Sequence, residues 1–190
     1  MITEKSASTS AKQVLRQIEE AAQRKFLPIV GPRKGRILAE EVRKAKPRHV
    51  LEVGTLIGYS AILIGKELDE NAEIVTIEIH RGEAKTAGEN VARANIPPKV
   101  TIITGDAVEV IPTLNGPFDF AFIDADKSEY FQYLRLAEDK FHSGTVVFAD
   151  NAGIFAQQMI DYLEYVRNSG RYESRYVQVG DDGVEISIKT

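Results

Sequence analysis

Two stretches of the sequence place acidic residues directly after an apolar run. The first, "FIDADKSEY", presents Asp124, Asp126 and Lys127 within four residues, and the second, "VVFADN", ends on Asp150 and Asn151. One acid at the end of a strand is explained by the start of the next helix, where carboxylates are favourable. The same pattern at two strand ends is harder to explain by capping alone and indicates a functional site.

The stretch "LEVGTLIGYS" has the composition of a strand, a tight turn and the start of a helix. Gly54 allows the turn, and Gly58 allows a ligand or a neighbouring helix to approach the backbone closely. A dinucleotide-binding loop has the spacing Gly-x-Gly-x-x-Gly, with a pyrophosphate at the helix N-terminus. This loop lacks the third glycine, and Glu52 would oppose a nearby phosphate.

Two further acids stand at predicted strand ends. Glu78 lies in "TIEIH", where a carboxylate can hold both hydroxyls of a ribose, and Asp106 lies in "GDA", where it can accept from an adenine amino group. Either acid alone is more simply a helix cap or a solvated side chain. Because ligands of open α/β sheets bind at the carboxyl ends of the strands, the joint pattern favours a nucleoside cofactor without a pyrophosphate.

Apolar, β-branched runs predict the five strands that position these residues, over 49–53, 73–79, 99–104, 118–124 and 145–150. Most of the runs are continuous rather than alternating, which is typical of parallel strands covered on both faces. Segments of helical spacing lie between them, so we expect a doubly wound α/β sheet. The final stretch "RYVQVGDDGVEISIK" predicts a hairpin and therefore an antiparallel strand near the C-terminus.

Helices are also predicted outside these alternating units. Two precede the first strand, in "AKQVLRQIEEAAQRK" and "KGRILAEEVRKAK", and the basic cluster "GPRKGR" is interpreted as a solvated helix start. A helix capped by Ser128 is expected to bury a stripe that ends at Phe141. Another is expected over 157–168, ended by Gly170. The first helix is placed either over the mouth of a site or against another subunit, so a homodimer stays open.

The composition is that of a globular protein with one domain over residues 1–190. The hydrophobic content of 43% and charged content of 27% are ordinary for a soluble chain of this length. A net charge of −4 makes nucleic acid a poor partner. The absence of cysteine excludes disulfides and thiolate metal sites. We find no secretory signal and no apolar run long enough to span a membrane, so a cytoplasmic location is expected.

The sequence resembles the metal-dependent S-adenosylmethionine O-methyltransferases, the group that includes the catechol and caffeoyl-CoA enzymes. The resemblance rests on "VLEVGTLIGYSA", "VTIEIH", "GDA", "FIDADKSEY", "VVFADN" and "DGVEISI", which occur in this order and cover about residues 27–189. It implies a Rossmann-like methyltransferase fold. The chain lacks the long insertion that caffeoyl-CoA enzymes carry after Asn151, which disfavours an acyl-CoA acceptor. It also lacks a tryptophan gate, for which Tyr59, Tyr130 and Phe155 are possible replacements.

The resemblance also implies roles for individual residues. The cofactor S-adenosylmethionine would be bound by a set of strand-end and loop residues, namely Glu52, Gly54, Tyr59, Ser60, Glu78, Ile79, Asp106, Ala107 and Asp124. Asp124, Asp150 and Asn151 would bind a divalent metal ion. Lys127 matches the catalytic lysine of the family, and Glu185 matches an acid that orients a catechol hydroxyl.

This set of residues implies a particular chemistry. Two carboxylates and one amide oxygen form a hard ligand set that selects Mg²⁺, Mn²⁺ or Ca²⁺. Metal coordination lowers the pKa of a phenolic hydroxyl, which is ordinarily about 10. Lys127 is expected to take the proton if the metal and burial lower its own pKa, although Asp124 and Asp126 act in the opposite direction. Because two adjacent oxygens chelate best, a small catechol-like aromatic hydroxyl compound is the expected acceptor.

Three other interpretations stay open at this point. A metal-independent small-molecule methyltransferase would use the acids as structural caps. A nicotinamide-dependent oxidoreductase is disfavoured by the missing third glycine. A nucleoside-sensing module without catalysis is possible on the same fold, but it does not explain a complete metal and lysine set. The three histidines are interpreted as structural or surface residues: His49, His80 and His142.

Overall fold

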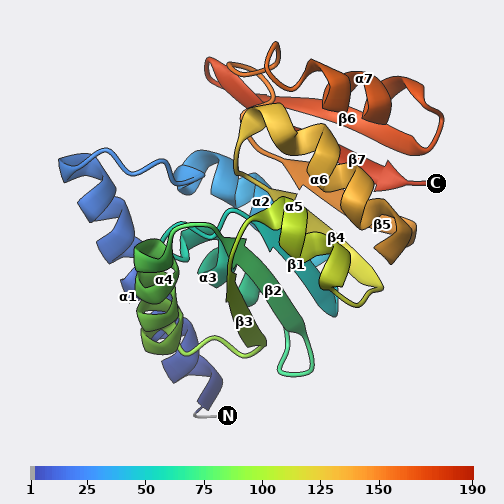
Figure 1. Ribbon diagram of the computed structural model, residues 1–190. Helices are drawn as coiled ribbons and strands as arrows, with labels where there is room; N and C mark the ends of the chain where they lie inside the picture. The colour runs from blue at the N-terminus through green and yellow to red at the C-terminus, as the bar shows by residue number, and fades with distance from the viewer. Residues whose placement is uncertain (1–2) are drawn as a thin grey trace.

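The computed structural model describes the backbone of residues 3–190 and the side chains of residues 11–190. Its centre is a seven-stranded sheet in the order β3-β2-β1-β4-β5-β7-β6 (Figure 1). The strands are β1 (His49–Val53), β2 (Glu73–Glu78), β3 (Lys99–Thr104), β4 (Phe118–Ile123), β5 (Phe141–Ala149), β6 (Tyr172–Val179) and β7 (Asp182–Lys189). The first five pair in parallel, and β7 is antiparallel to both of its neighbours. The predicted fold, with one antiparallel strand near the C-terminus, is confirmed.

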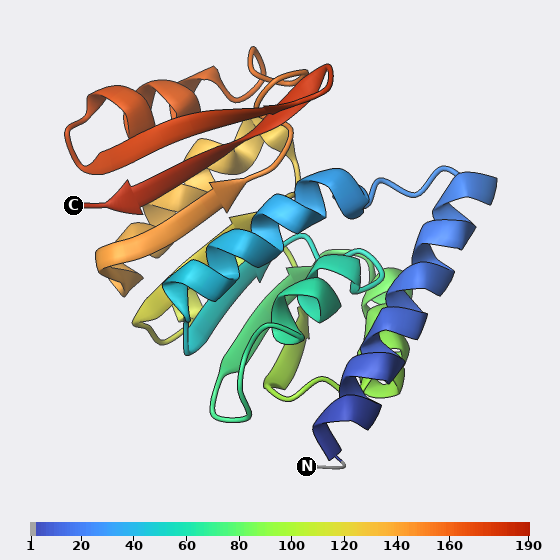
Figure 2. The ribbon, with the colours of Figure 1, turned by 180° about the vertical axis from the view of Figure 1, so that it is seen from behind.

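Helices cover both faces of the sheet. They are α1 (Thr3–Arg24), α2 (Gly31–Ala45), α3 (Tyr59–Gly65), α4 (Arg81–Ala94), α5 (Ala107–Val110), α6 (Tyr130–Ala137) and α7 (Ile160–Asn168), with 3₁₀ turns at Ile111–Thr113, Lys127–Glu129 and Glu138–Lys140. Figure 1 shows α5, α6 and α7 in front of the sheet, and Figure 2 shows α2 and α3 over the opposite face.

The strand β4 shows why its sequence is continuously apolar. Phe120 and Phe122 belong to the core under α2 and α3, whereas Ala121 and Ile123 belong to the core under α6 and α7. Alternate side chains of a strand point to opposite faces, so a strand covered on both sides needs apolar residues throughout. The strand order reverses between β1 and β4, and ligands of such sheets bind in the crevice at this reversal.

Helix α1 packs against its own chain. Its buried face, which includes Val14, Leu15 and Ile18, belongs to the core shared with α3, and both views show α1 running beside α4 (Figures 1 and 2). The apolar face of α1 is therefore buried within its own chain. To bury that face, the helix needs neither of the two expected positions, over the mouth of the site or against another subunit. Among residues 3–190, no helix is both long enough and apolar enough to cross a membrane.

Three helix boundaries differ from the sequence prediction. Asp126, not Ser128, is a cap, and it caps the 3₁₀ turn Lys127–Glu129 that precedes α6: its Oδ1 accepts from both the backbone N–H and the hydroxyl of Ser128, at 2.9 and 2.7 Å. Helix α6 ends at Ala137, and Phe141 already begins β5, because the polar turn Glu138–Lys140 separates them. The helix expected over 157–168 begins only at Ile160. Gly170, with φ +73°, follows its end as predicted.

Candidate active site

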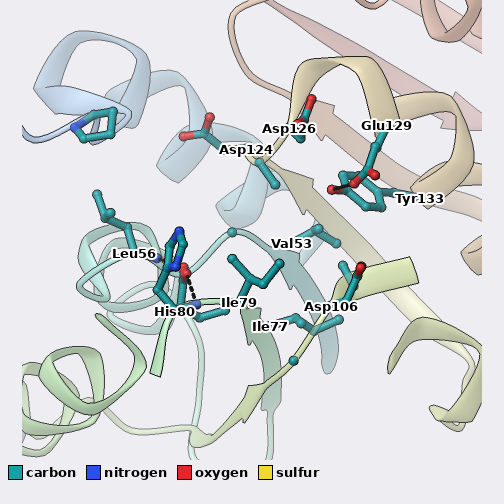
Figure 3. A pocket seen from close by; sticks show the side chains of 16 residues that line it. Val53, Leu56, Ile77, Ile79, His80, Asp106, Asp124, Asp126, Glu129 and Tyr133 are labelled. Atoms are coloured by element: carbon teal, nitrogen blue, oxygen red, sulfur yellow. Dashed lines mark hydrogen bonds between the residues drawn. The ribbon is translucent and has the colours of Figure 1, made fainter. Parts of the chain in front are cut away.

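A cavity of about 470 Å³ opens at the carboxyl ends of β1, β2, β3 and β4. Figure 3 shows Asp124 and Asp126 on one side of it, and Leu56, Ile79 and His80 on the other. Several of the predicted cofactor residues line this cavity, namely Gly54, Glu78, Ile79, Asp106, Ala107 and Asp124. Sequence reasoning missed other lining residues, namely Pro28, Leu56, His80, Glu129 and Tyr133. The cavity therefore occupies the crevice that the strand order predicts.

The first loop reaches this position because of its glycines. Gly54 has φ +96°, and a Cβ there would lie 2.1 Å from the carbonyl oxygen of Asp124. Only glycine therefore lets the end of β1 lie against the end of β4. Gly58 has φ +85°, and a Cβ there would lie 3.3 Å from Cα of Ala87 in α4. The close approach expected at Gly58 is thus made by a helix.

Two acids on the cavity wall are held by backbone N–H groups. The carboxylate of Glu78 accepts from the backbone N–H groups of Leu56 and His80, at 2.7 and 2.9 Å. Asp106 is the N-cap of α5, and its Oδ1 accepts from the N–H of Val108 at 2.8 Å. Carboxylate oxygens have further lone pairs, so both acids can bind ligand hydroxyl or amino groups while keeping these bonds.

Three other predicted cofactor residues are buried and are not among those that line the cavity. Tyr59 is buried, and its hydroxyl donates to Oε1 of Glu19 in α1 at 2.6 Å. Because its buried side chain is bound to α1, Tyr59 does not form an aromatic gate. Ser60 and Glu52 are buried as well, and Glu52 accepts from the hydroxyl of Thr76.

Glu52 is a fully buried carboxyl in the middle of the sheet. Burial raises its pKa to about 7; hydrogen bonds from Ser60 and Thr76 act in the opposite direction, and the charges of Asp124 and Glu78 add to the rise. Its Oε1 has no hydrogen bond of good geometry within the described residues. The protonated form is therefore the one that the fold accommodates best.

Replacing Glu52 by glutamine tests this burial through the pH dependence of stability. The folded protein binds the proton more tightly than the unfolded chain, whose carboxyl has the ordinary pKa of 4.5. Proton binding by Glu52 therefore makes its full contribution to the free energy of unfolding below pH 4.5. This contribution is lost as the pH rises through about 7. Glu52→Gln mimics the protonated acid, so thermal melting should find it similar to wild type at about pH 5 and more stable by on the order of 2 kcal/mol at about pH 8. A pH-independent difference would contradict the assignment.

The second part of the site is a cluster of carboxylates at the ends of β4 and β5. Ile123 and Ala149 are partners in the sheet, so the residues that follow them, Asp124 and Asp150, leave neighbouring strands at the same edge. Asp150 is only 1% exposed. Burial, followed by the charge of Asp124, raises the pKa of Asp150 to about 7. Two acids that repel each other in a buried place require a positive partner.

Each acid of the cluster has a lysine beside it. Lys127 Nζ donates to Oδ1 of Asp124 at 2.8 Å and to the hydroxyl of Tyr130 at 3.0 Å. Tyr130 is fully buried in the core, so it does not form an aromatic gate. Lys34 Nζ lies 2.6 Å from Oδ1 of Asp150, an ion pair without the geometry of a hydrogen bond.

Lys34 corrects the interpretation of "GPRKGR" as a solvated helix start. Its side chain is 14% exposed, and Nζ lies between Asp150 and Asp182, 2.9 Å from Oδ2 of the latter. Burial acts to lower the pKa of Lys34, but the charges of the two acids outweigh it and raise that pKa. No local pattern could have identified this role, because Asp182 is 148 positions away in the chain.

Asn151 is held by the same acid. Its Nδ2 donates to Oδ2 of Asp182 at 2.8 Å, and its backbone has the left-handed φ of 61° that asparagine tolerates. Asp182 begins β7 in the "GDDG" turn, which sequence reasoning treated only as a hairpin. Burial acts to raise the pKa of Asp182, but hydrogen bonds from Lys34, Ile154 and Asn151 outweigh it and hold the pKa well below its usual range.

Glu185, expected to orient an acceptor hydroxyl, has another partner. Its carboxylate is fully buried and receives two bonds from Arg167 of α7, Nε to Oε1 at 2.9 Å and Nη2 to Oε2 at 2.6 Å. The hydroxyl of Ser174 also donates to it, at 2.7 Å. Both oxygens are thus used in a structural ion pair. The role carried over from the resemblance does not fit these contacts.

The residues present fit a hard cation. Asp124, Asp150 and Asn151 offer oxygen ligands from two adjacent strand ends, and Oδ1 of the buried Asp150 has Nζ of Lys34 2.6 Å away in an ion pair. A second group of possible ligands, Glu78, His80 and Glu83, has its ligand atoms within 4.8 Å of one another at the rim of the cofactor cavity. In that group the carboxylate of Glu78 is already bound by two backbone N–H groups.

Comparison with known proteins agrees with this fold. The sequence model of the O-methyltransferase family matches residues 3–170. The chain is 37% identical to a catechol O-methyltransferase of Niastella koreensis over 64% of its length, and 36% identical to catechol O-methyltransferase B of Danio rerio over 84%. The structure matches the O-methyltransferase from Bacillus cereus, solved in complex with SAH, with a TM-score of 0.83 and 28% identity over 96% of this chain and 91% of that one.

The chain therefore belongs to the O-methyltransferase family. It spans 57% and 64% of the lengths of the two catechol O-methyltransferases named above. All three of these similar proteins are named as O-methyltransferases, so the interpretation as a nicotinamide-dependent oxidoreductase gains no support.

Proposed function

We propose that the protein transfers a methyl group from S-adenosylmethionine to a hydroxyl of a small catechol-like aromatic, and that it requires a divalent cation. The observation that carries the proposal is the position of Asp124. This residue lines the cofactor cavity, and its charge also acts on Asp150 in the carboxylate cluster. A methyl donor in the cavity and an acceptor at the cluster would therefore meet at this residue.

The reaction forms a bond between the acceptor oxygen and the methyl carbon. It breaks the carbon–sulfur bond, whose electron pair stays on sulfur, and the hydroxyl proton must leave. When bound, S-adenosylmethionine supplies a methyl group on cationic sulfur, and the divalent cation supplies Lewis acidity that favours the ionised hydroxyl.

The residues of the chain do the remaining work. The acidic wall formed by Glu78, Asp106 and Asp124 complements a positively charged donor. Lys127, beside Asp124, would accept the hydroxyl proton in its neutral amine form. The strand ends fix the two reactants relative to each other, and orientation of this kind contributes roughly 7–11 kcal/mol in favourable cases.

One observation favours a metal-independent methyltransferase instead. Lys127 and Lys34 already pair with Asp124 and Asp150, so the two carboxylates have positive partners from the chain itself. In that case the acids would hold the loops in place, and one hydroxyl on the acceptor would be sufficient. The two functions differ in what a chelator does and in whether an acceptor with two adjacent hydroxyls is preferred.

Methylation of catechol and of phenol, each with Mg²⁺ and with excess chelator, separates the two functions. We expect product from catechol with Mg²⁺, little from phenol, and loss of activity in chelator that returns with added Mg²⁺. Undiminished methylation in excess chelator would reject the cation. Binding of S-adenosylhomocysteine, measured by calorimetry in the same samples, should be unaffected by the chelator; absence of that binding would reject the cofactor assignment.

A further inference from the structure

The carboxylate of Asp182 organises the turn that carries Asn151. Its Oδ1 accepts from the backbone N–H groups of Gly153 and Ile154, both at 3.1 Å, and its Oδ2 accepts from Nδ2 of Asn151 at 2.8 Å. The turn also sits tightly on the start of β7, because a Cβ on Gly153 would lie 3.0 Å from Cα of Asp182. Backbone and side chain of this turn are therefore fixed by one residue.

These contacts determine which atom of the Asn151 amide is available. A carboxylate only accepts hydrogen bonds, so the atom of Asn151 that faces Asp182 must be the amide nitrogen. Lys34, the other partner of the same Oδ2, only donates. The amide oxygen is consequently the atom that can bind a cation, because an amide nitrogen is a poor ligand for one.

We propose that Asp182 is a positioning residue for the candidate cation site: by holding Nδ2 of Asn151, it presents the amide oxygen of Asn151 as a ligand. The inference rests on the proposed function, because it requires the cation. Asp182 does not itself touch the reacting atoms. It resembles the outer partners of metal ligands, whose replacement typically weakens metal binding by about 10–100-fold.

Asp182→Asn tests the inference with almost no change of shape. The new side chain keeps an oxygen for Gly153 and Ile154, but its NH₂ group would face the NH₂ of Asn151 and also the ammonium of Lys34. Two donors repel, so the amide of Asn151 turns over and presents nitrogen to the site. Asp181→Asn is the matched control, because Asp181 is the adjacent acid and is exposed.

The readout is the Kd of Mn²⁺, measured by electron paramagnetic resonance, together with the Kd of S-adenosylhomocysteine. We expect Asp182→Asn to bind Mn²⁺ about 10–100-fold more weakly, with the S-adenosylhomocysteine Kd unchanged. Asp181→Asn should bind both as the wild type does. Equal Mn²⁺ affinity in the two variants would overturn the inference while leaving the proposed function intact.

A swap of the two side chains gives an independent test. In Asn151→Asp/Asp182→Asn, the new asparagine donates to one oxygen of the new aspartate, and the other oxygen becomes the ligand. Mn²⁺ binding should return toward the wild-type value. If Asp182→Asn does not fold, the double variant tests the inference on its own. A swap that binds Mn²⁺ at least about 10-fold more weakly than wild type would overturn the inference. If wild type binds no Mn²⁺, or if Asp150→Ala binds Mn²⁺ as strongly as wild type does, the proposed cation site is wrong. The inference about Asp182 then fails as well.

Discussion

Asp150→Ala should lower cation-dependent methyl transfer by on the order of 10³-fold, because metal-ion catalysis contributes several kcal/mol to the barrier. The variant removes a buried carboxylate at the end of β5 but leaves Lys34 its second partner, Asp182, at 2.9 Å. The fold of the cofactor cavity should therefore persist. Steady-state kinetics with catechol and Mg²⁺ measure the loss, and calorimetry should find S-adenosylhomocysteine binding close to wild type.

The matched control for Asp150→Ala is Asp161→Ala, the same change at an exposed acid in α7. It should leave the kinetics unchanged. If Asp150→Ala kept its activity, and that activity resisted chelator, the acids would be structural and the metal-independent function would be correct.

Lys127→Met and Lys127→Arg should both lower kcat by about 10²–10⁴-fold, the usual contribution of a positioned proton acceptor. Arginine can keep the ion pair with Asp124, but it cannot give up its proton at any ordinary pH. The pair of variants thus separates proton transfer from charge neutralisation. Rate measurements at saturating S-adenosylmethionine should show the loss in kcat, with KM for the cofactor little changed.

The control for this pair is Lys85→Met, at a lysine that is 79% exposed on α4. It should behave as wild type. Substantial activity in Lys127→Arg, with loss only in Lys127→Met, would mean that Lys127 serves Asp124 as a counter-charge and that another group takes the proton.

The sheet was predictable because its central strands are buried on both faces. Such strands need uninterrupted apolar runs, and the acids that follow them, such as Asp124 and Asp150, mark where the chain leaves the core. The position of Gly54 was predictable for a similar reason, since its backbone conformation and close contact admit only glycine.

The partners of these acids were not predictable. Lys34 and Asp182 are surface-type residues in sequence, and they become part of the cluster only because α2 and the β6–β7 hairpin meet the end of β5. Distant ion pairs leave no periodic pattern. The role given to Glu185 followed from a short motif match, and the contact with Arg167 of α7 could not be read from that motif.

The most direct test of the proposed cation site is the position of a bound cation in crystals grown with Mn²⁺ and S-adenosylhomocysteine. Anomalous scattering from manganese locates the ion without reference to activity. We expect one strong peak among the side-chain oxygens of Asp124, Asp150 and Asn151. No peak at that place, or a peak only among Glu78, His80 and Glu83 at the cavity rim, would contradict the proposed site.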